Sequence, residues 1–212
     1  MFTLREPSEA DIARFLLDQS NLPFSYAEVG ATRLSSAPSA APRGFTVDHN
    51  RIELGRGAGV FQCAVDALKH WRQFELGWVS IAPRGVKLEK GATVVVKAWA
   101  CGMWSLNACR VVYVVDETQP GAGATPVKRD EAEPITRFGF AYGTLPDHIE
   151  RGEERFLIEW DHKGDSVWYD ILAFSQPRHP LVKLGSPVAR VMQKRFARDS
   201  LAAMKSALTH PR

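Results

Sequence analysis

The sequence predicts an α+β fold: a curved antiparallel sheet of about six to seven strands wrapped on a long C-terminal helix, with an extra N-terminal helix. Three features of the chain predict it. Six strand-like segments follow one another with only turns and loops between them, which favours antiparallel neighbours. A further strand and a helix precede these six. The chain closes with a long amphipathic helix, which can cover one face of the sheet.

The N-terminal helix is predicted from its start signal. Ser8 is followed three residues later by Asp11, just ahead of the apolar helical positions, and this spacing is typical of a capping box. We expect the helix to end before Asn21, so that residues 1–35 form an N-terminal helical extension. The small, proline-rich segment 35–44 is expected to be a loop.

A strand from Phe45 to Leu54 and a helix over residues 60–76 are expected next. The helix is predicted because its apolar residues recur at helical spacing. Glycines at positions 55, 57 and 59 join the two elements. They indicate either a phosphate-binding loop or a flexible turn. The dinucleotide-binding motif would need glycine where Val60 stands, so the turn is favoured. The apolar face of the helix comprises Phe61, Ala64, Val65, Leu68, Trp71 and Phe74.

Six further segments have strand composition. A glycine- and proline-rich stretch, residues 118–134, lies between two of them and is interpreted as an inserted loop. We therefore expect a single domain over residues 1–212. The last helix is predicted to follow Pro187 and to run to about Leu208. The six strand segments are Trp78–Ile81, Thr93–Trp99, Cys109–Val115, Arg137–Gly143, Glu154–Trp160 and Val167–Phe174.

Composition indicates a globular protein of ordinary type. The chain has 212 residues, 45% hydrophobic content and a formal net charge of +3, which is too little for a dedicated nucleic-acid binder. We expect the three cysteines to be reduced, as in a cytoplasmic protein, although a bridge between Cys101 and Cys109 across a hairpin stays open. Cys63 would then remain free. The N-terminus lacks the apolar run of a signal peptide, and we find no apolar stretch of membrane-spanning length.

The segment from Phe138 to Trp160 has the most specific pattern. Its first strand alternates sharply: one face carries Phe138, Phe140 and Tyr142, and the other carries only glycine and alanine. A face without side chains permits close approach of a ligand or another backbone. The alternative is that the C-terminal helix packs tightly there.

A polar turn is expected after this strand, with His148, Glu150, Glu153 and Glu154. A histidine beside carboxylates can act in acid–base chemistry or bind a cation. The spacing matches no metal-ligand pattern, so we predict no metal and no cofactor. A solvated turn is the alternative interpretation.

On the last helix, Arg190, Lys194, Arg198 and Lys205 lie near one face. This stripe could meet phosphates or anionic lipid, or it could be the solvated side of an amphipathic helix.

Several segments resemble the family catalogued as domain of unknown function 1990. The resemblance implies a single soluble domain without an established activity or catalytic residues to carry over. The element order also resembles the helix-grip arrangement of birch-pollen-allergen-like proteins, where a curved sheet encloses an apolar cavity with the last helix. The matching segments are YAEVGATR (Tyr26–Arg33), IELGRGAGVFQCAVDALKHW (Ile52–Trp71), FGFAYGTLPDHIERGEERF (Phe138–Phe156), AFSQP (Ala173–Pro177) and QKRFARDSL (Gln193–Leu201).

Three functions follow as hypotheses. The preferred one is binding of a hydrophobic or lipid-like small molecule between sheet and C-terminal helix. The second is an enzyme that uses the same cavity, with His148 and Glu153 or Glu154 as the acid–base group. The third is binding of a partner or nucleic acid by the basic stripe, which the modest net charge disfavours. The expected ligand-binding residues are Trp71, Trp99, Tyr113, Phe140, Tyr142 and Phe156.

Overall fold

One curved antiparallel sheet forms the body of the protein. The computed structural model describes residues 1–34, 42–118, 135–178 and 186–209. In this part of the chain, eight strands pair in the order β2-β8-β7-β6-β5-β4-β3, and β1 adds to β5. The strands are β1 (Phe2–Thr3), β2 (Thr46–Arg56), β3 (Val79–Ala82), β4 (Thr93–Ala100), β5 (Met103–Asp116), β6 (Ile135–Thr144), β7 (Glu150–Asp161) and β8 (Ser166–Pro177).

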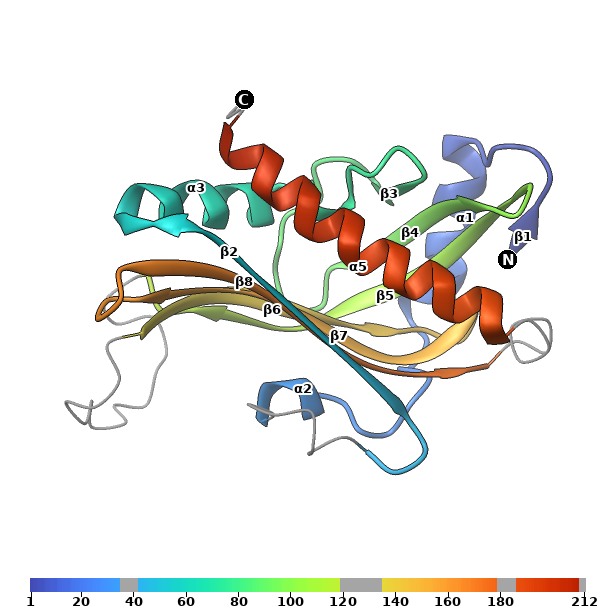
Figure 1. Ribbon diagram of the computed structural model, residues 1–212. Helices are drawn as coiled ribbons and strands as arrows, with labels where there is room; N and C mark the ends of the chain where they lie inside the picture. Colours follow the sequence, from blue (N-terminus) through green and yellow to red (C-terminus); the bar gives the residue numbers. More distant parts are fainter. Residues whose placement is uncertain (35–41, 119–134, 179–185, 210–212) are drawn as a thin grey trace.

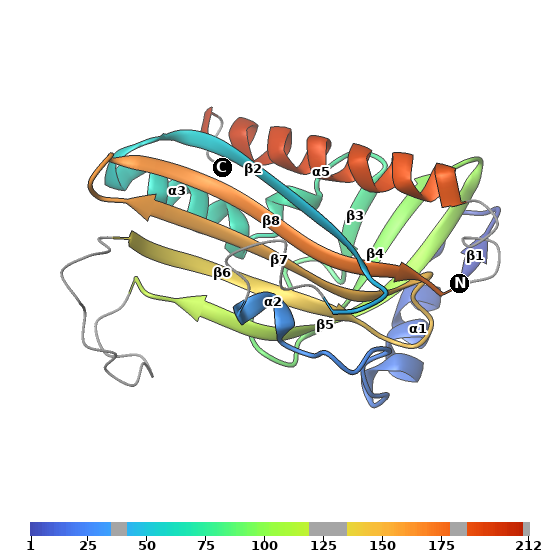
Figure 2. The same ribbon diagram turned by 60° about the horizontal axis from the view of Figure 1, so that its bottom comes forward.

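The helices lie on both sides of this sheet. α5 (Ser186–Thr209) crosses the concave face diagonally, and α3 (Gly57–Lys69) lies beside it on the same side (Figure 1). α1 (Glu9–Ser20) packs against β4 and β5, and the short α2 (Ala31–Leu34) lies on the outer face near β7 and β8 (Figure 2). The predicted α+β fold, with its curved sheet, long C-terminal helix and N-terminal helix, is confirmed. It is the helix-grip arrangement.

The start of α1 agrees in detail with the prediction. Ser8 is the N-cap and accepts a hydrogen bond from the backbone N–H of Asp11, while the Asp11 carboxylate accepts one from the N–H of Ser8. The pair satisfies two backbone donors that the helix itself leaves without partners. The helix ends at Ser20, and Asn21 is its C-cap.

The predicted helix over residues 60–76 is wrong in its second half. α3 ends at Lys69, and a separate 3₁₀ turn, η2 (Arg72–Phe74), follows. Trp71 between them adopts a left-handed conformation with φ of 58°, and its indole N–H donates to the carbonyl oxygen of Val86 at 3.0 Å. The same side chains are buried as predicted, because the turn keeps Trp71 and Phe74 on the core side.

Two apolar layers result from this arrangement. The main core lies between the concave face and α3, η2 and the second half of α5. A smaller cluster on the outer face joins Ile12 and Phe15 of α1 to Val95 and Leu106 of the sheet and to Leu145, which follows β6. The N-terminal extension therefore covers part of the sheet face that lies away from α5.

Cys101 and Cys109 do not pair, and the three cysteines are free. Cys101 lies in the exposed turn between β4 and β5, whereas Cys109 is buried farther along β5 opposite Val94. In the described residues, none of the helices is both long and apolar enough to span a membrane. The predicted loops at 35–44 and 118–134 fall mostly or almost entirely outside the described residues.

Candidate functional site

A cavity of about 460 Å³ lies between the first half of α5 and the sheet. Its position follows from side-chain size. Near α3 the concave face carries large aromatic residues that fill the space, whereas near the start of α5 small residues face it. Phe196 separates the two regions, because it packs against the core ring of Phe74 at 5.4 Å and also lines the cavity. The small lining residues include Ala98, Ala100, Ser105, Gly152, Ala173, Ser175, Ala189 and Ala197.

Glu154 is a carboxyl group inside this cavity. It accepts a hydrogen bond of 2.7 Å from the hydroxyl of Tyr142 on the neighbouring strand. Burial, followed by the nearby charges of Glu150 and Asp48, raises the pKa of Glu154 from 4.5 to about 7. Burial also raises the pKa of the Tyr142 hydroxyl, which therefore stays protonated as the donor. Near neutral pH, Glu154 can hold or release a proton, as an acid–base group must.

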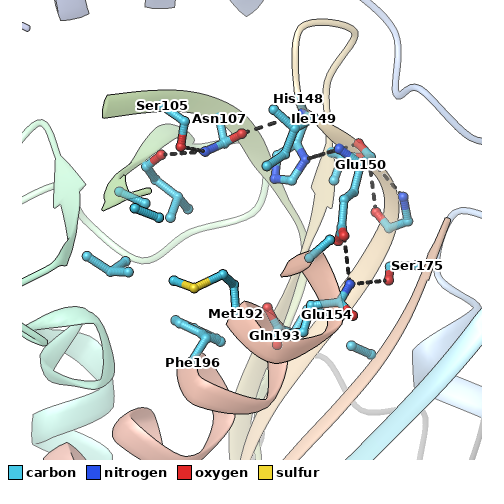
Figure 3. A pocket seen from close by; sticks show the side chains of 18 of the residues that line it. Ser105, Asn107, His148, Ile149, Glu150, Glu154, Ser175, Met192, Gln193 and Phe196 are labelled. Carbon is cyan, nitrogen blue, oxygen red and sulfur yellow. Dashed lines mark hydrogen bonds between the residues drawn. The ribbon is translucent and has the colours of Figure 1, made fainter. Parts of the chain in front are cut away.

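A polar network fixes α5 over one side of the cavity (Figure 3). Gln193 donates to the carboxylate of Glu150 at 2.7 Å and to the hydroxyl of Ser175 at 3.0 Å. Arg190 binds both carboxylate oxygens of Asp48, at 2.6 and 2.9 Å. Desolvation by burial is the main reason that the pKa of Glu150 is raised.

His148 lines the cavity but is not joined to an acid. Its Nδ1 lies 3.0 Å from both the backbone nitrogen and the carbonyl oxygen of Glu150. Burial lowers the pKa of His148 from 6.5 to about 4, so its ring is neutral near pH 7. Among the described residues, no hydrogen bond connects His148 with the side chain of Glu153 or Glu154. The predicted His–Glu pair is therefore absent from this part of the chain.

Glu153 lies on the other side of the sheet from Glu154. The two residues are adjacent on β7, and successive strand residues point to opposite faces. The carboxylate of Glu153 is buried on the outer face, where it accepts hydrogen bonds from the hydroxyl of Tyr26 at 2.7 Å and the backbone N–H of Gly30 at 2.7 Å. The N–H of Thr32 (3.0 Å) and its hydroxyl also donate to it. The sequence prediction of one polar turn is wrong because Glu150, Glu153 and Glu154 belong to a strand.

This buried carboxylate explains the segment from Tyr26 to Arg33. The segment crosses the outer face of the sheet with its donors directed at Glu153, and the Arg33 guanidinium lies 5.5 Å from the ring centre of Tyr113. The segment can pack closely on the sheet because this face of β6 carries only glycine and alanine. A Cβ atom on Gly143 would lie 2.1 Å from the Tyr26 hydroxyl. Gly143 therefore faces the N-terminal segment and not α5, which was the alternative interpretation.

The predicted ligand-binding residues separate into four groups. Tyr142 lines the cavity. Trp71, Phe140 and Phe156 are buried in the aromatic core beside it, with ring centres of Trp71 and Phe140 4.8 Å apart. Trp99 is 39% exposed and packs on Trp104 near the tip of the β4–β5 hairpin.

Tyr113 lies on the outer face, where its hydroxyl is 2.8 Å from that of Thr32. Tyr113 was predicted to line the cavity. It lies on the opposite face because the register of β5 shifts at a bulge between Val111 and Tyr113. Burial raises the pKa of Tyr113 to about 12.

Only part of the basic stripe of α5 is available to contact phosphates or anionic lipid. Arg190 turns toward the sheet and is bound to Asp48, and Arg198 is bound to Asp199. Lys194 and Lys205 are exposed. At the glycine-rich turn, the first N–H of α3, from Gly57, donates to the carbonyl oxygen of Asp165, as expected for a structural turn.

Several cavity residues were not recognised from the sequence. Asp48, Asn107 and Gln193 lie on three different elements, and only the folded sheet brings them to one space. A signal is present for α5, because Val188, Met192 and Phe196 recur at helical spacing. In β4, the change from valine at 94 and 96 to alanine at 98 and 100 also indicates a widening space on one face.

Replacing Glu154 by glutamine is expected to stabilise the protein at alkaline pH. Because the pKa of Glu154 is raised above 4.5, its contribution to stability is full below pH 4.5 and is lost as the pH rises to about 7. The loss is up to about 3 kcal/mol. Urea unfolding at several pH values measures it. The difference in unfolding free energy between variant and wild type should grow between pH 4.5 and 7 and then stay constant.

His148 acts in the opposite direction and cancels in this comparison. Its pKa is lowered to about 4, so its contribution is full above pH 6.5 and is lost as the pH falls to about 4. Both proteins contain it, so the difference between them isolates Glu154. Glu53→Gln on β2 is the matched control, because Glu53 is well exposed. A difference that does not vary with pH would contradict the raised pKa of Glu154.

Comparisons with known proteins identify the family. The model of the family described as "Domain of unknown function (DUF1990)" matches residues 25–203. A UPF0548 protein of Dictyostelium discoideum is 35% identical over 219 residues, covering 98% of this chain and 96% of that protein. A UPF0548 protein of Deinococcus radiodurans is 34% identical over 212 residues, covering 93% and 94%.

Solved structures show a more distant likeness. The Zhui aromatase/cyclase from Streptomyces sp. R1128 has a TM-score of 0.49 and 10% identity, covering 78% of this chain and 94% of that chain. Ara h 8.0201 has a TM-score of 0.43 and 12% identity, covering 78% and 99%.

Proposed function

The chain belongs to the DUF1990 family, and from that premise we propose that it binds a small, largely apolar molecule in the cavity between α5 and the sheet. The observation that carries the proposal is the cavity itself. Its volume of about 460 Å³ lies within the range typical of small-molecule sites. Apolar side chains such as Val96, Met192 and Phe196 supply much of its wall.

The arrangement of polar groups supports the same function. Apolar walls with a few directed polar groups are typical of ligand sites. Here Glu154, Asn107 and Ser105 lie among the lining residues, and Asn107 is held by hydrogen bonds to Ser105 and to the carbonyl oxygen of Val96. Fixed polar groups of this kind orient a ligand without loss of side-chain freedom on binding.

Filling the cavity is expected to remove binding. Ala98 lines it from β4, and Ala98→Phe would place a ring in the space. N-phenyl-1-naphthylamine, an uncharged dye at neutral pH that fluoresces in apolar surroundings, is the probe. We expect its affinity to fall at least tenfold in the variant, about 1.4 kcal/mol. Native mass spectrometry of the purified wild-type protein would also detect any ligand carried through purification.

The matched control is Ala202→Phe on the exposed side of α5. It adds the same ring outside the cavity and should bind the dye as wild type does. Circular dichroism and urea unfolding verify that both variants are folded. Equal dye binding by Ala98→Phe and wild type, or no binding by wild type together with a clean apo mass, would overturn the proposed function.

Acid–base catalysis in the same cavity is a second candidate function. A specific observation favours it: Glu154 has a pKa near 7 and accepts from the Tyr142 hydroxyl. The test uses any ligand that native mass spectrometry identifies. Its conversion by wild type, and the loss of conversion in Glu154→Gln with binding retained, would support an enzyme. Unchanged ligand mass after prolonged incubation with wild type would argue for a binding protein.

A further inference from the structure

Acidic groups predominate among the ionisable residues that line the cavity. Four lining residues carry carboxyl groups: Asp48, Glu150, Glu153 and Glu154. The carboxylate of Glu153 is bound on the outer face of the sheet, and the histidine of the lining is neutral near pH 7. We infer that the cavity selects a ligand with a protonated amine at one end of an apolar body, and that the ammonium group binds the carboxyl group of Glu154. This inference rests on the proposed function and deepens it.

Glu154 has room for a ligand donor. Within the described part of the chain, its one hydrogen-bond donor is Tyr142, which binds Oε2. A carboxylate accepts several hydrogen bonds through its two oxygens, so Oε1 can accept from a ligand. The side chain is not fully enclosed by protein atoms, and Glu154 is one of the residues that line the cavity. An ammonium group there would form a charge-assisted hydrogen bond.

Two neighbouring arginines are already bound to other acids. Arg190 makes two hydrogen bonds with Asp48 and one with Gln193. Arg195 is 3.5 Å from Asp199 and lies over the ring of Trp78. The N-terminal ammonium of Met1, which acts electrostatically on His148, donates to the carbonyl oxygen of Leu106 at 3.2 Å. At the end of the cavity that holds Asp48, Glu150 and Glu154, a ligand carboxylate would therefore meet acids. Repulsion between like charges disfavours fatty-acid-like ligands at this end.

The titratable groups that interact with Glu154 come from five strands of the sheet. Tyr142 on β6, Glu150 on β7 and Asp48 on β2 interact with it, and Cys109 on β5 and Tyr169 on β8 are influenced by its charge. Each of these groups is neutral or acidic. A bound ammonium supplies the missing positive charge, so Glu154 should lose its proton when the amine binds.

The experiment compares three ligands that share one apolar chain: n-octylamine, n-octanol and octanoate. Each is titrated against wild-type protein carrying N-phenyl-1-naphthylamine, and displacement of the dye gives the affinity at pH 7.0. We expect octylamine to bind at least tenfold more tightly than octanol, and octanoate to bind more weakly than octanol. In Glu154→Gln, the advantage of octylamine over octanol should disappear, while octanol affinity should stay within about twofold of wild type.

Proton release is an independent readout. Calorimetry of octylamine binding at pH 6, in two buffers with different ionisation enthalpies, should show release of a proton from Glu154. The release should vanish at pH 8.5, where Glu154 is already ionised, and in Glu154→Gln at either pH. Glu53→Gln is the charge-matched control, because Glu53 lies outside the cavity lining. It should behave as wild type in both measurements.

The outcomes separate this inference from the proposed function. If the dye and octanol bind but octylamine has no advantage, or octanoate binds best, the amine inference is wrong and the cavity still binds apolar ligands. If Glu154→Gln keeps the preference for octylamine, Glu154 is not its cause and the inference is wrong. If neither the dye nor any octyl compound binds wild type, the proposed function fails, and this inference fails with it.

Discussion

Replacing Glu153 by alanine is expected to lower the free energy of unfolding by at least about 3 kcal/mol. The carboxylate is 2% exposed and is the common acceptor for two backbone N–H groups and two hydroxyls. Alanine would leave these donors without an acceptor, and a buried donor without a partner costs about 1–3 kcal/mol. The segment from Tyr26 to Thr32 would then lose its anchor on the outer face of the sheet.

Urea unfolding and hydrogen exchange measure this effect. We expect the amides of Gly30 and Thr32 to lose protection, whereas the amides in the centre of β8 keep their order of protection. Tyr26→Phe is a graded variant, because it removes one of the four donors and leaves the carboxylate satisfied by the others. It should cost about 0.5–1.5 kcal/mol.

Glu53→Ala is the control for Glu153→Ala. Glu53 makes an exposed ion pair with Arg56 at 3.8 Å, and such pairs contribute about 0–1 kcal/mol. A Glu153→Ala protein as stable as the Glu53→Ala protein would show that the buried network does not hold the N-terminal segment.

Gly152→Ala is expected to destabilise the protein by about 3–5 kcal/mol or to prevent folding. Gly152 has a φ of +148°, which L-residues rarely adopt, and a Cβ atom there would lie 1.9 Å from the carbonyl oxygen of Phe174. The overlap is with backbone, so β7 and β8 would have to separate. Such separation would also move Glu153 and Glu154, since both follow Gly152 on β7.

Gly59→Ala is the matched substitution for this test. Gly59 lies in the first turn of α3 with no atom within 4 Å of the Cβ position, and it has no positive φ. Alanine in a helix is favoured over glycine by about 0.5–1 kcal/mol, so Gly59→Ala should equal or exceed wild type in stability. Thermal unfolding monitored by circular dichroism compares both variants. A Gly152→Ala protein with unchanged midpoint would contradict the close approach of β7 and β8.

Local patterns in the sequence were sufficient for most elements. The capping box at Ser8 and Asp11 located the start of α1, because it depends on residues three apart. The strands other than β1 were predicted, but β7 begins at Glu150 and not at Glu154. The polar residues at the start of β7 resemble a turn in the sequence. Their hydrogen-bond partners lie far away in the chain, so local patterns do not show that these residues belong to a strand. Likewise, the end of α3 depends on Trp71 bonding to Val86, which periodicity does not reveal.

The sequence by itself determined the order of the long helices and strands, the antiparallel sheet and the amphipathic character of the last helix. These follow from alternation, helical spacing and capping, which act between near neighbours. Only the tertiary structure decided which acid faces the cavity. Glu154 meets Tyr142 on one side of the sheet, and Glu153 meets Tyr26 on the other. The register of β7 and the path of the N-terminal segment set that difference. Both depend on contacts between residues far apart in the chain.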